Sequence, residues 1–267
     1  MSDPDAFAIP RVPLQPPAET RAEMQVAGLT FPVIVSHERR RDARASIGRR
    51  GVLIRLPVGE SVAWCDRQVA SLLHWAARTI GRDPGRFRIR PPRVYHHDQR
   101  LSVAESEFRL HLEYADRATN AVRLGEVDRT TGCRTLRLIL ANGLSQAQRD
   151  HALPRLVSRG LALAKEPELR GHVEHLNDEF FRRPLGTVRY RYARTRWGSC
   201  SARGNISIAT RLLLAPPEVF EYVLVHELAH LVELNHSPRF WRLVELVVPD
   251  FRDHQAWLRR HQEDCQI

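Results

Sequence analysis

The stretch VHELAHLVELNH, residues 225–236, limits what this chain can fold into more than any other part of the sequence. It carries three histidines and two glutamates in an otherwise apolar run, which is the pattern of a buried helix that bears titratable groups. A charge or an imidazole that is left unpaired in the protein interior costs several kcal/mol. Because a bound metal ion is one of the few partners that offsets this cost, the stretch predicts a metal site.

The HELAH segment has the spacing HExxH, which has a geometric meaning on a helix. Residues four positions apart project from one face with Cβ atoms about 5–6 Å apart, so His226 and His230 can bind one ion. Glu227 adjoins the first ligand, where its carboxylate can take a proton from a metal-activated water without binding the metal. His236 follows past the expected helix end, after Asn235, a residue type that tolerates the left-handed conformation of a turn. Since a catalytic zinc ion uses three protein ligands and keeps one open position, we predict Zn2+ on His226, His230 and His236, with Glu227 as the catalytic residue.

Three alternatives compete with this ligand set. His226 and His230 could be core residues satisfied by hydrogen bonds, and His236 could be a solvent-facing residue before a helix cap. Glu233, on the same helix face as His230, is a rival third ligand. We expect His236 to be the third ligand, because it comes from a separate segment and approaches a tetrahedral site from a better direction. Metzincins share the histidine spacing, but they have glycine at the position of Glu233 and a methionine turn downstream. The methionines here are Met1 and Met24, so a metzincin is excluded.

Composition narrows the class of protein. A chain of 267 residues can form one large or two modest domains. Its four cysteines form no CxxC pair, which argues against a disulfide framework and against a zinc ribbon. The proline-rich N-terminus lacks the apolar region of a signal peptide, and no run approaches the ~18 apolar residues of a membrane span. We therefore expect a cytoplasmic protein with no membrane association, and the sequence makes no prediction of its oligomeric state.

The net charge of +10 raises the hypothesis of a nucleic-acid partner. However, Lys165 is the only lysine among 41 basic residues, and such an arginine bias is typical of a GC-rich genome. The densest basic run, residues 37–50, interleaves acids and small residues and is interpreted as a hairpin with solvated faces. The pairs His96–His97 and His172/His175 have no acid or turn context that points to a site, and they are expected to be surface residues.

Hydrophobic patterns divide the chain into three regions. Residues 1–22 are predicted to be a disordered, proline-rich tail, residues 23–144 a β-rich region, and residues 145–267 the catalytic domain. The β-rich region is expected to contain a strand meander, one helix that is capped by Ser61 and ends near Ile80, and three later strands. The expected strands cover residues 30–36, 43–47, 52–57, 108–114, 121–127 and 135–140.

The catalytic region is predicted to begin with helices. A helix that opens at Ser145 is expected to kink at Pro154, because proline removes a helical hydrogen bond, and a second helix fits residues 168–181. Two strands over residues 186–200 and 204–210 follow, joined by a turn.

The helix signals of the last part of the chain are clear. Pro217 suits the first position of a helix that runs to about Val232, since its missing N–H would be unpaired there anyway. Ser237 followed by Pro238 predicts another helix start, and this helix runs to about Val247. Together with the strands before them, these helices predict an α+β fold.

The text TRWGSCSARGNISIATRLLLAPPEVFEYVLVHELAHLVELNHSPRFW, residues 195–241, closely resembles the YgjP-like metallopeptidases, which are relatives of the SprT and WLM zinc proteases. The likeness includes the RWGSC element, the YVxxHELAH helix and the NHSxxFW segment, and it extends more weakly towards residue 24. The resemblance implies a compact zincin core, with zinc on the three histidines and Glu227 as acid and base. It also implies that residues 204–210 form the edge strand above the metal, where an extended peptide substrate could pair by β-augmentation.

The residues of the RWGSC element carry separate expectations. Trp197 is expected to pack in the core. Cys200 is expected to be a small buried residue, since a fourth protein ligand would close the open position of the zinc ion. Arg196 is the residue that we can name as an oxyanion stabiliser.

The leading hypothesis is a zinc-dependent hydrolase, a cytoplasmic metallopeptidase that cuts a peptide laid along residues 204–210. A second hypothesis keeps the metal and makes the chain a hydrolase of nucleotide phosphoanhydrides, with arginines that hold the phosphates. The sequence has no Walker or glycine-rich phosphate loop, which counts against it. A third hypothesis, motivated by the net charge of +10, is a nucleic-acid-associated binding module or protease.

Overall fold

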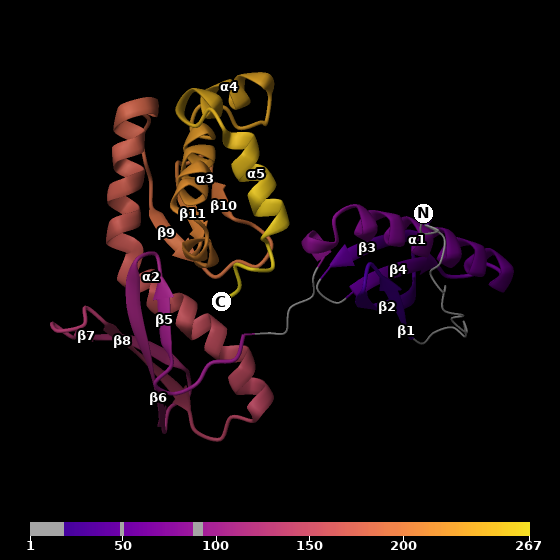
Figure 1. The fold of residues 1–267 in the computed structure, drawn as a ribbon, viewed down its shortest axis with the longest axis horizontal. Coiled ribbons are helices and arrows are strands. Elements are labelled where there is room, and N and C mark those ends of the chain that lie inside the picture. The colour runs from indigo at the N-terminus through magenta and orange to yellow at the C-terminus, as the bar shows by residue number, and fades with distance from the viewer. Residues whose placement is uncertain (1–18, 49–50, 88–92) are drawn as a thin grey trace. The chain divides into compact units, whose positions relative to one another are not determined.

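The computed structural model describes residues 19–48, 51–87 and 93–267. The chain forms two compact units, residues 1–91 and 92–267, and the described part of each has its own hydrophobic core (Figure 1). Both units contain strands and helices, so the predicted α+β class is confirmed. Most of the predicted tail, residues 1–22, lies outside the described residues, but residues 20–22 belong to the first strand.

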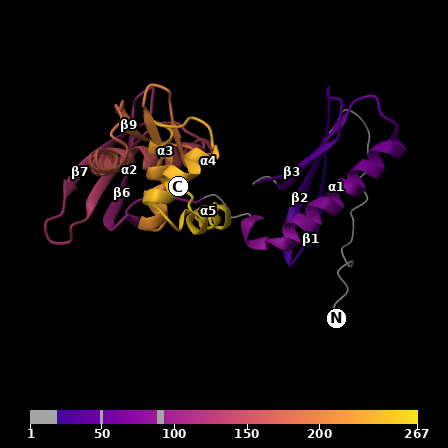
Figure 2. The same ribbon diagram turned by 90° about the horizontal axis from the view of Figure 1, so that it is seen from above.

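The first unit is a four-stranded sheet with one long helix packed on it (Figure 2). The strand order is β1-β2-β4-β3, and β2 and β4 run parallel. Its elements are β1 (Thr20–Val26), β2 (Leu29–Glu38), β3 (Arg44–Gly48), β4 (Gly51–Pro57), α1 (Val62–Arg82) and a 3-10 helix (Pro84–Phe87). Helix α1 begins at the predicted cap, where the Ser61 side chain accepts a hydrogen bond from the Trp64 N–H.

The strand meander predicted for this unit is wrong, because β4 lies between β2 and β3. In strand β4, Val52, Ile54 and Leu56 are fully buried, which suits the interior of a sheet. Strand β3 alternates between exposed and partly buried residues, which suits an edge. The hairpin predicted within residues 37–50 is formed instead by β3 with β4.

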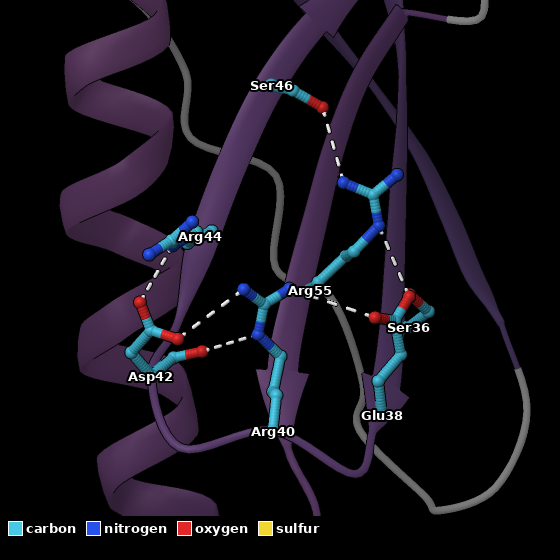
Figure 3. A network of polar contacts seen from close by, with 7 residues as sticks. All are labelled: Ser36, Glu38, Arg40, Asp42, Arg44, Ser46 and Arg55. Carbon is cyan, nitrogen blue, oxygen red and sulfur yellow. Dashed lines mark hydrogen bonds and ion pairs between the residues drawn. The ribbon is translucent and has the colours of Figure 1, made fainter.

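Figure 3 shows the ion pairs that two acids, Glu38 and Asp42, form with arginines on the surface of this unit. The Asp42 carboxylate accepts a hydrogen bond from Arg44 Nε at 2.8 Å and lies 3.4 Å from Arg40 Nη2. Glu38 pairs with Arg55 Nε at 3.2 Å and with Arg40 at 3.7 Å. These exposed pairs support the interpretation of the run as a solvated face.

The second unit begins with a four-stranded sheet of order β5-β6-β8-β7, and a long helix packs on β7 and β8 (Figure 1). The elements are β5 (Arg100–Val103), β6 (Ser106–Ala115), β7 (Ala121–Val127), β8 (Arg134–Ala141) and α2 (Gln146–Leu176). The three later strands of the sequence prediction are confirmed as β6, β7 and β8. The apolar side chains of this sheet share one core with α2 and the C-terminal helices, so the two units divide at 91/92 and not at the expected 144/145.

Helix α2 is one continuous helix of 31 residues, so the prediction of two helices is wrong. Pro154 and Pro167 lie inside it and leave the carbonyl groups of Asp150 and Leu163 without their helical donors. Asp150 and Leu163 are exposed, so water can satisfy both carbonyl groups. The helix continues into a π-helix, Asn177–Phe181, and ends at the left-handed Arg182.

A second, smaller sheet of three strands follows α2 and has the order β10-β11-β9. Its strands are β9 (Val188–Arg191), β10 (Gly198–Cys200) and β11 (Ile206–Ala209). Strand β11 pairs with β10 on one side and with β9 on the other, so the prediction of residues 204–210 as an edge strand is wrong. Ile206 and Ile208 are fully buried and fill the centre of the sheet, which leaves β10 and β9 at its edges.

Three helices complete the unit, after a 3-10 helix at Thr210–Leu214. They are α3 (Pro217–Ala229), α4 (Pro238–Val247) and α5 (Phe251–Arg260). Helix α3 starts at Pro217 as predicted but ends before Val232, and α4 has the predicted Ser237 cap and the predicted end. Figures 1 and 2 show α3 inside the unit, where it contacts α2, the small sheet, α4 and α5. Among the described residues, no helix is both long and apolar enough to cross a membrane.

Candidate metal centre

Residues 226–229 of the HELAH segment form the last turn of α3, a largely buried helix, and His230 is its C-cap residue. Val225, Leu228 and Ala229 are fully buried, which is why this segment is apolar. His226 and His230 project together from the helix, and their ring centroids lie 5.1 Å apart. The four-residue spacing therefore places the two imidazoles side by side, as the sequence predicted.

His236 joins these two histidines from the segment between α3 and α4. Its ring centroid lies 5.0 Å from that of His226 and 4.8 Å from that of His230. One ligand atom from each of the three side chains lies within 4.8 Å of the others. The chain makes this turn without a positive φ at Asn235, so the left-handed conformation predicted there is wrong.

Glu233, the rival ligand, contributes to the cluster through its backbone. Its carbonyl oxygen lies 3.1 Å from His230 Nδ1, which can donate a hydrogen bond to it. A proton held on Nδ1 leaves the Nε2 lone pair of His230 free to bind a metal ion. The Glu233 carboxylate is not a member of the histidine cluster.

Three imidazoles are a donor set that can hold a metal ion, and one pair of their nitrogens lies close to the spacing expected on a tetrahedral zinc ion. His226 Nε2 and His236 Nε2 lie 3.1 Å apart. Two nitrogens on a tetrahedral zinc ion with Zn–N distances of ~2.0–2.1 Å are separated by ~3.3 Å. Burial, followed by the neighbouring His230 and His236 imidazoles, lowers the pKa of His226 to about 3. Burial likewise lowers the pKa of His230. Both rings are therefore neutral near pH 7, the state in which imidazole binds metals.

Aromatic residues of α4 hold the three imidazoles in place. The Phe240 ring centroid lies 4.9, 4.6 and 4.7 Å from those of His226, His230 and His236. Trp241 stacks on His236 with a centroid distance of 5.6 Å. The sequence did not predict these contacts. Phe240 and Trp241 follow His236 by four and five positions, about one helical turn, and this spacing could have indicated them.

Glu227 lies beside the cluster and against strand β10. The glutamate is 5% exposed, and burial raises the pKa of Glu227 to about 7. A Cβ atom at Gly198 would lie 2.5 Å from Glu227 Oε1, so the absence of a side chain at residue 198 makes room for the carboxylate. This contact explains why the WGSC element has a glycine at residue 198, which the sequence alone did not reveal.

The other residues of the RWGSC element lie around this contact. Trp197 packs against the core, and the Arg211 guanidinium lies 3.6 Å from the centroid of its ring. Cys200 is half-buried, is not a member of the histidine cluster, and burial raises the pKa of its thiol to about 11. Arg196 is exposed and lines a pocket next to Glu227.

Three of the four histidines that were expected to be surface residues outside any site have acidic neighbours: His97, His172 and His175. His97 forms a surface cluster with Asp98 and His111, and the Asp98 carboxylate is held by Arg109 Nη2 at 2.8 Å. His172 Nε2 lies 3.1 Å from a carboxylate oxygen of Glu221. His175 Nε2 lies 3.5 Å from a carboxylate oxygen of Glu179. His97 and His175 are exposed, as expected of surface residues, whereas His172 is half-buried.

The chain is similar to a known protein family and to a solved structure. The metallopeptidase zymogen of Pyrococcus abyssi abylysin is 31% identical, over 34% of this chain and 90% of that chain, with a TM-score of 0.32. The comparison with curated proteins gave no significant match. The model of the family described as "YgjP-like, metallopeptidase domain" matches residues 41–261. Because this match spans most of the chain, the protein belongs to the YgjP-like metallopeptidase family.

Proposed function

We propose that the protein is a zinc-dependent peptidase in which His226, His230 and His236 hold the zinc ion and Glu227 is the general base. The observation that carries this proposal is the convergence of one ligand nitrogen from each of three imidazoles, within 4.8 Å of one another, beside a buried carboxylate. The family match supports peptide hydrolysis as the reaction. The four free thiols support the cytoplasm as the compartment, since cysteines remain reduced there.

The chain supplies the proton transfers of this reaction. Zinc, when bound, would act as a Lewis acid that activates water at neutral pH. The Glu227 carboxylate accepts the proton of the attacking water and then gives it to the leaving amine nitrogen. Its burial favours this exchange, because a carboxyl group with a pKa near 7 can both gain and lose a proton at working pH.

Strand β10 is the edge on which we place the peptide substrate, in place of residues 204–210. It lies at the end of the sheet order, and Gly198 in it contacts Glu227. A peptide that pairs with β10 by β-augmentation would therefore pass next to the general base. The absence of a side chain at Gly198 also lets a substrate backbone come close to the carboxylate.

The test compares substrates of the competing hypotheses on one protein sample. We expect zinc-loaded protein to cleave denatured casein and to leave nucleoside triphosphates intact, and Glu227→Gln to be at least ~10²-fold slower. Triphosphate hydrolysis that depends on Glu227, without casein cleavage, would make the protein a phosphoanhydride hydrolase. Retention on DNA that weakens steeply with salt would instead support a nucleic-acid partner.

A further inference from the structure

A pocket of about 320 Å³ opens directly beside the proposed general base. Its walls come from the start of β10, from α3 and from α5, and His226 and Glu227 form one side of it. Tyr222 lies one helical turn before His226 and contacts its ring at a centroid distance of 6.0 Å. A substrate residue in this pocket is therefore adjacent to the bond that the site would cleave.

The polar groups of this pocket are mainly hydrogen-bond donors. Arg196 and Arg259 stand at its rim, and Tyr222 and Gln255 line its interior. The Gln255 amide interacts with the Tyr222 hydroxyl, and the charge of Arg259 acts on the same hydroxyl. We call this site, lined by Arg196, Tyr222, Gln255 and Arg259 with Glu227, the arginine pocket.

A third arginine adds positive charge behind the wall of the arginine pocket. Arg211 is 5% exposed and lies over Trp197, whose ring lines the pocket. Its Nη1 donates a hydrogen bond to the carbonyl oxygen of Gln262, another lining residue, at 3.2 Å. A buried guanidinium is weakly screened by salt, so its field reaches the pocket more effectively than that of a surface charge.

The charge of the arginine pocket is local and does not simply follow the net charge of the chain. A larger groove of the same unit, about 780 Å³, is lined by Glu105, Glu168, Glu218 and Glu221 and has the opposite charge. In the arginine pocket, Glu227 is the one carboxylate among the lining residues, beside the two arginines Arg196 and Arg259. The charged side chains that line the two grooves of this unit are therefore mainly of opposite sign.

We infer that the arginine pocket binds a carboxylate of the substrate residue next to the cleaved bond. The inference rests on the proposed peptidase function. An arginine pairs with a carboxylate through charge-assisted, bidentate hydrogen bonds, and the tyrosine hydroxyl and glutamine amide can complete the shell of donors. The carboxylate is either an aspartate or glutamate side chain or the C-terminal carboxylate of the peptide.

Matched peptides test the inference by cleavage. A glutamate is moved one position at a time along a neutral peptide, each peptide has a glutamine twin, and each is made with a free and with an amidated C-terminus. We expect one glutamate position to raise kcat/KM by ~10-fold over its glutamine twin. If the pocket binds a glutamate side chain, the gain should also appear in the amidated peptides. If it binds the C-terminal carboxylate, only peptides with a free C-terminus should be cleaved faster.

Variants assign the preference to the arginine pocket. Arg259→Gln and Arg196→Gln should each reduce the preference for glutamate, and Arg259→Glu should reverse it in favour of lysine. Arg260→Gln is the matched control, because Arg260 is an exposed neighbour on α5 that does not line the pocket. Equal rates for all glutamate and glutamine twins, with and without a free C-terminus, would overturn the inference.

A binding measurement separates this inference from the proposed function. Glu227→Gln protein should bind the preferred acidic peptide ~10-fold more tightly than its glutamine twin, and Arg259→Gln should abolish the difference. If wild type cleaves no peptide while this binding preference holds, the peptidase proposal fails and the pocket assignment stands. If peptides are cleaved without any charge preference in rate or binding, the pocket assignment alone fails.

Discussion

The carboxylate of Glu227 lies against the backbone of Gly198, so close that a Cβ atom there would stand 2.5 Å from Oε1 and 2.7 Å from Cγ. Real Cβ atoms essentially never make such short contacts, so any larger residue at 198 must displace the glutamate. The glycine of the WGSC element and the glutamate of the HELAH helix, 29 positions apart in the sequence, are therefore packed directly against each other.

Gly198→Ala should inactivate the enzyme without removing the metal. The added methyl group moves the Glu227 carboxylate, and a displacement of about 1 Å can lower the rate ~10²-fold. We expect zinc content to stay near wild type, because the three atoms nearest to the added methyl group all belong to Glu227 and none belongs to a histidine. Peptidase assays with metal analysis of the same sample check this, and full activity of Gly198→Ala would contradict it.

Gly171→Ala is the matched control for this substitution. Gly171 lies within helix α2, and a Cβ atom there would have no neighbour within 4 Å. The variant should be as active as wild type and more stable by ~0.5–1 kcal/mol, since alanine favours the helix.

Glu227 should make the metal-free protein less stable as the pH rises. Burial raises its pKa from 4.5 to about 7, so within this window the folded protein holds a proton that the unfolded chain has lost. The stability that the neutral carboxyl group contributes is fully present below pH 4.5, the pKa in the unfolded chain. It is lost as the pH rises through about 7, the pKa in the folded protein, by at most ~1.4 kcal/mol per pH unit.

Metal-free Glu227→Gln should lack this loss, because its amide does not titrate. Urea unfolding of both metal-free proteins at about pH 5 and about pH 8 should show the variant gaining stability relative to wild type at the higher pH. The contribution of His226 is the same in both proteins and cancels in the comparison. Stability curves that stay parallel over this range would show that Glu227 is not buried as a neutral group.

The sequence predicted those features of the site that depend on local spacing. The pairing of His226 with His230 follows from helical periodicity, and the start of α4 follows from the Ser237 cap and Pro238. Long-range pairing was not readable in the same way. Strand β11 is central because it pairs with β9, the first strand of the small sheet, as well as with β10. The contact of Gly198 with Glu227 likewise joins two elements that local sequence patterns do not connect.

The predicted domain boundary at 144/145 differs from the division at 91/92 for a similar reason. Patterns in the sequence separate strands from helices, and the expected boundary at 144/145 followed that change. The structure groups the sheet of β5–β8 with α2, because the apolar side chains of Leu110, Leu136 and Leu138 need the helix to cover them. Which helix covers which sheet is decided by packing over the whole unit.

The third ligand is separable from its rival by two alanine variants. His236→Ala should weaken zinc binding at least ~10²-fold, because it removes one of three converging nitrogens. Glu233→Ala should keep the metal, since the carbonyl oxygen that lies 3.1 Å from His230 Nδ1 belongs to the backbone and survives the substitution. Metal analysis after dialysis decides between them, and loss of zinc from Glu233→Ala alone would reverse the assignment.

Phe240 should affect zinc affinity although its side chain carries no metal-binding atom. Its ring is fully buried and contacts all three imidazoles, so Phe240→Ala removes the surface that sets their orientation. We expect a loss of ~3–5 kcal/mol in unfolding free energy and weaker zinc binding. Phe180→Ala, at a phenylalanine that is 42% exposed, is the control and should change both quantities little. Denaturant unfolding and zinc titration of the two variants measure this, and wild-type zinc affinity in a folded Phe240→Ala protein would show that the histidines hold their geometry without the ring.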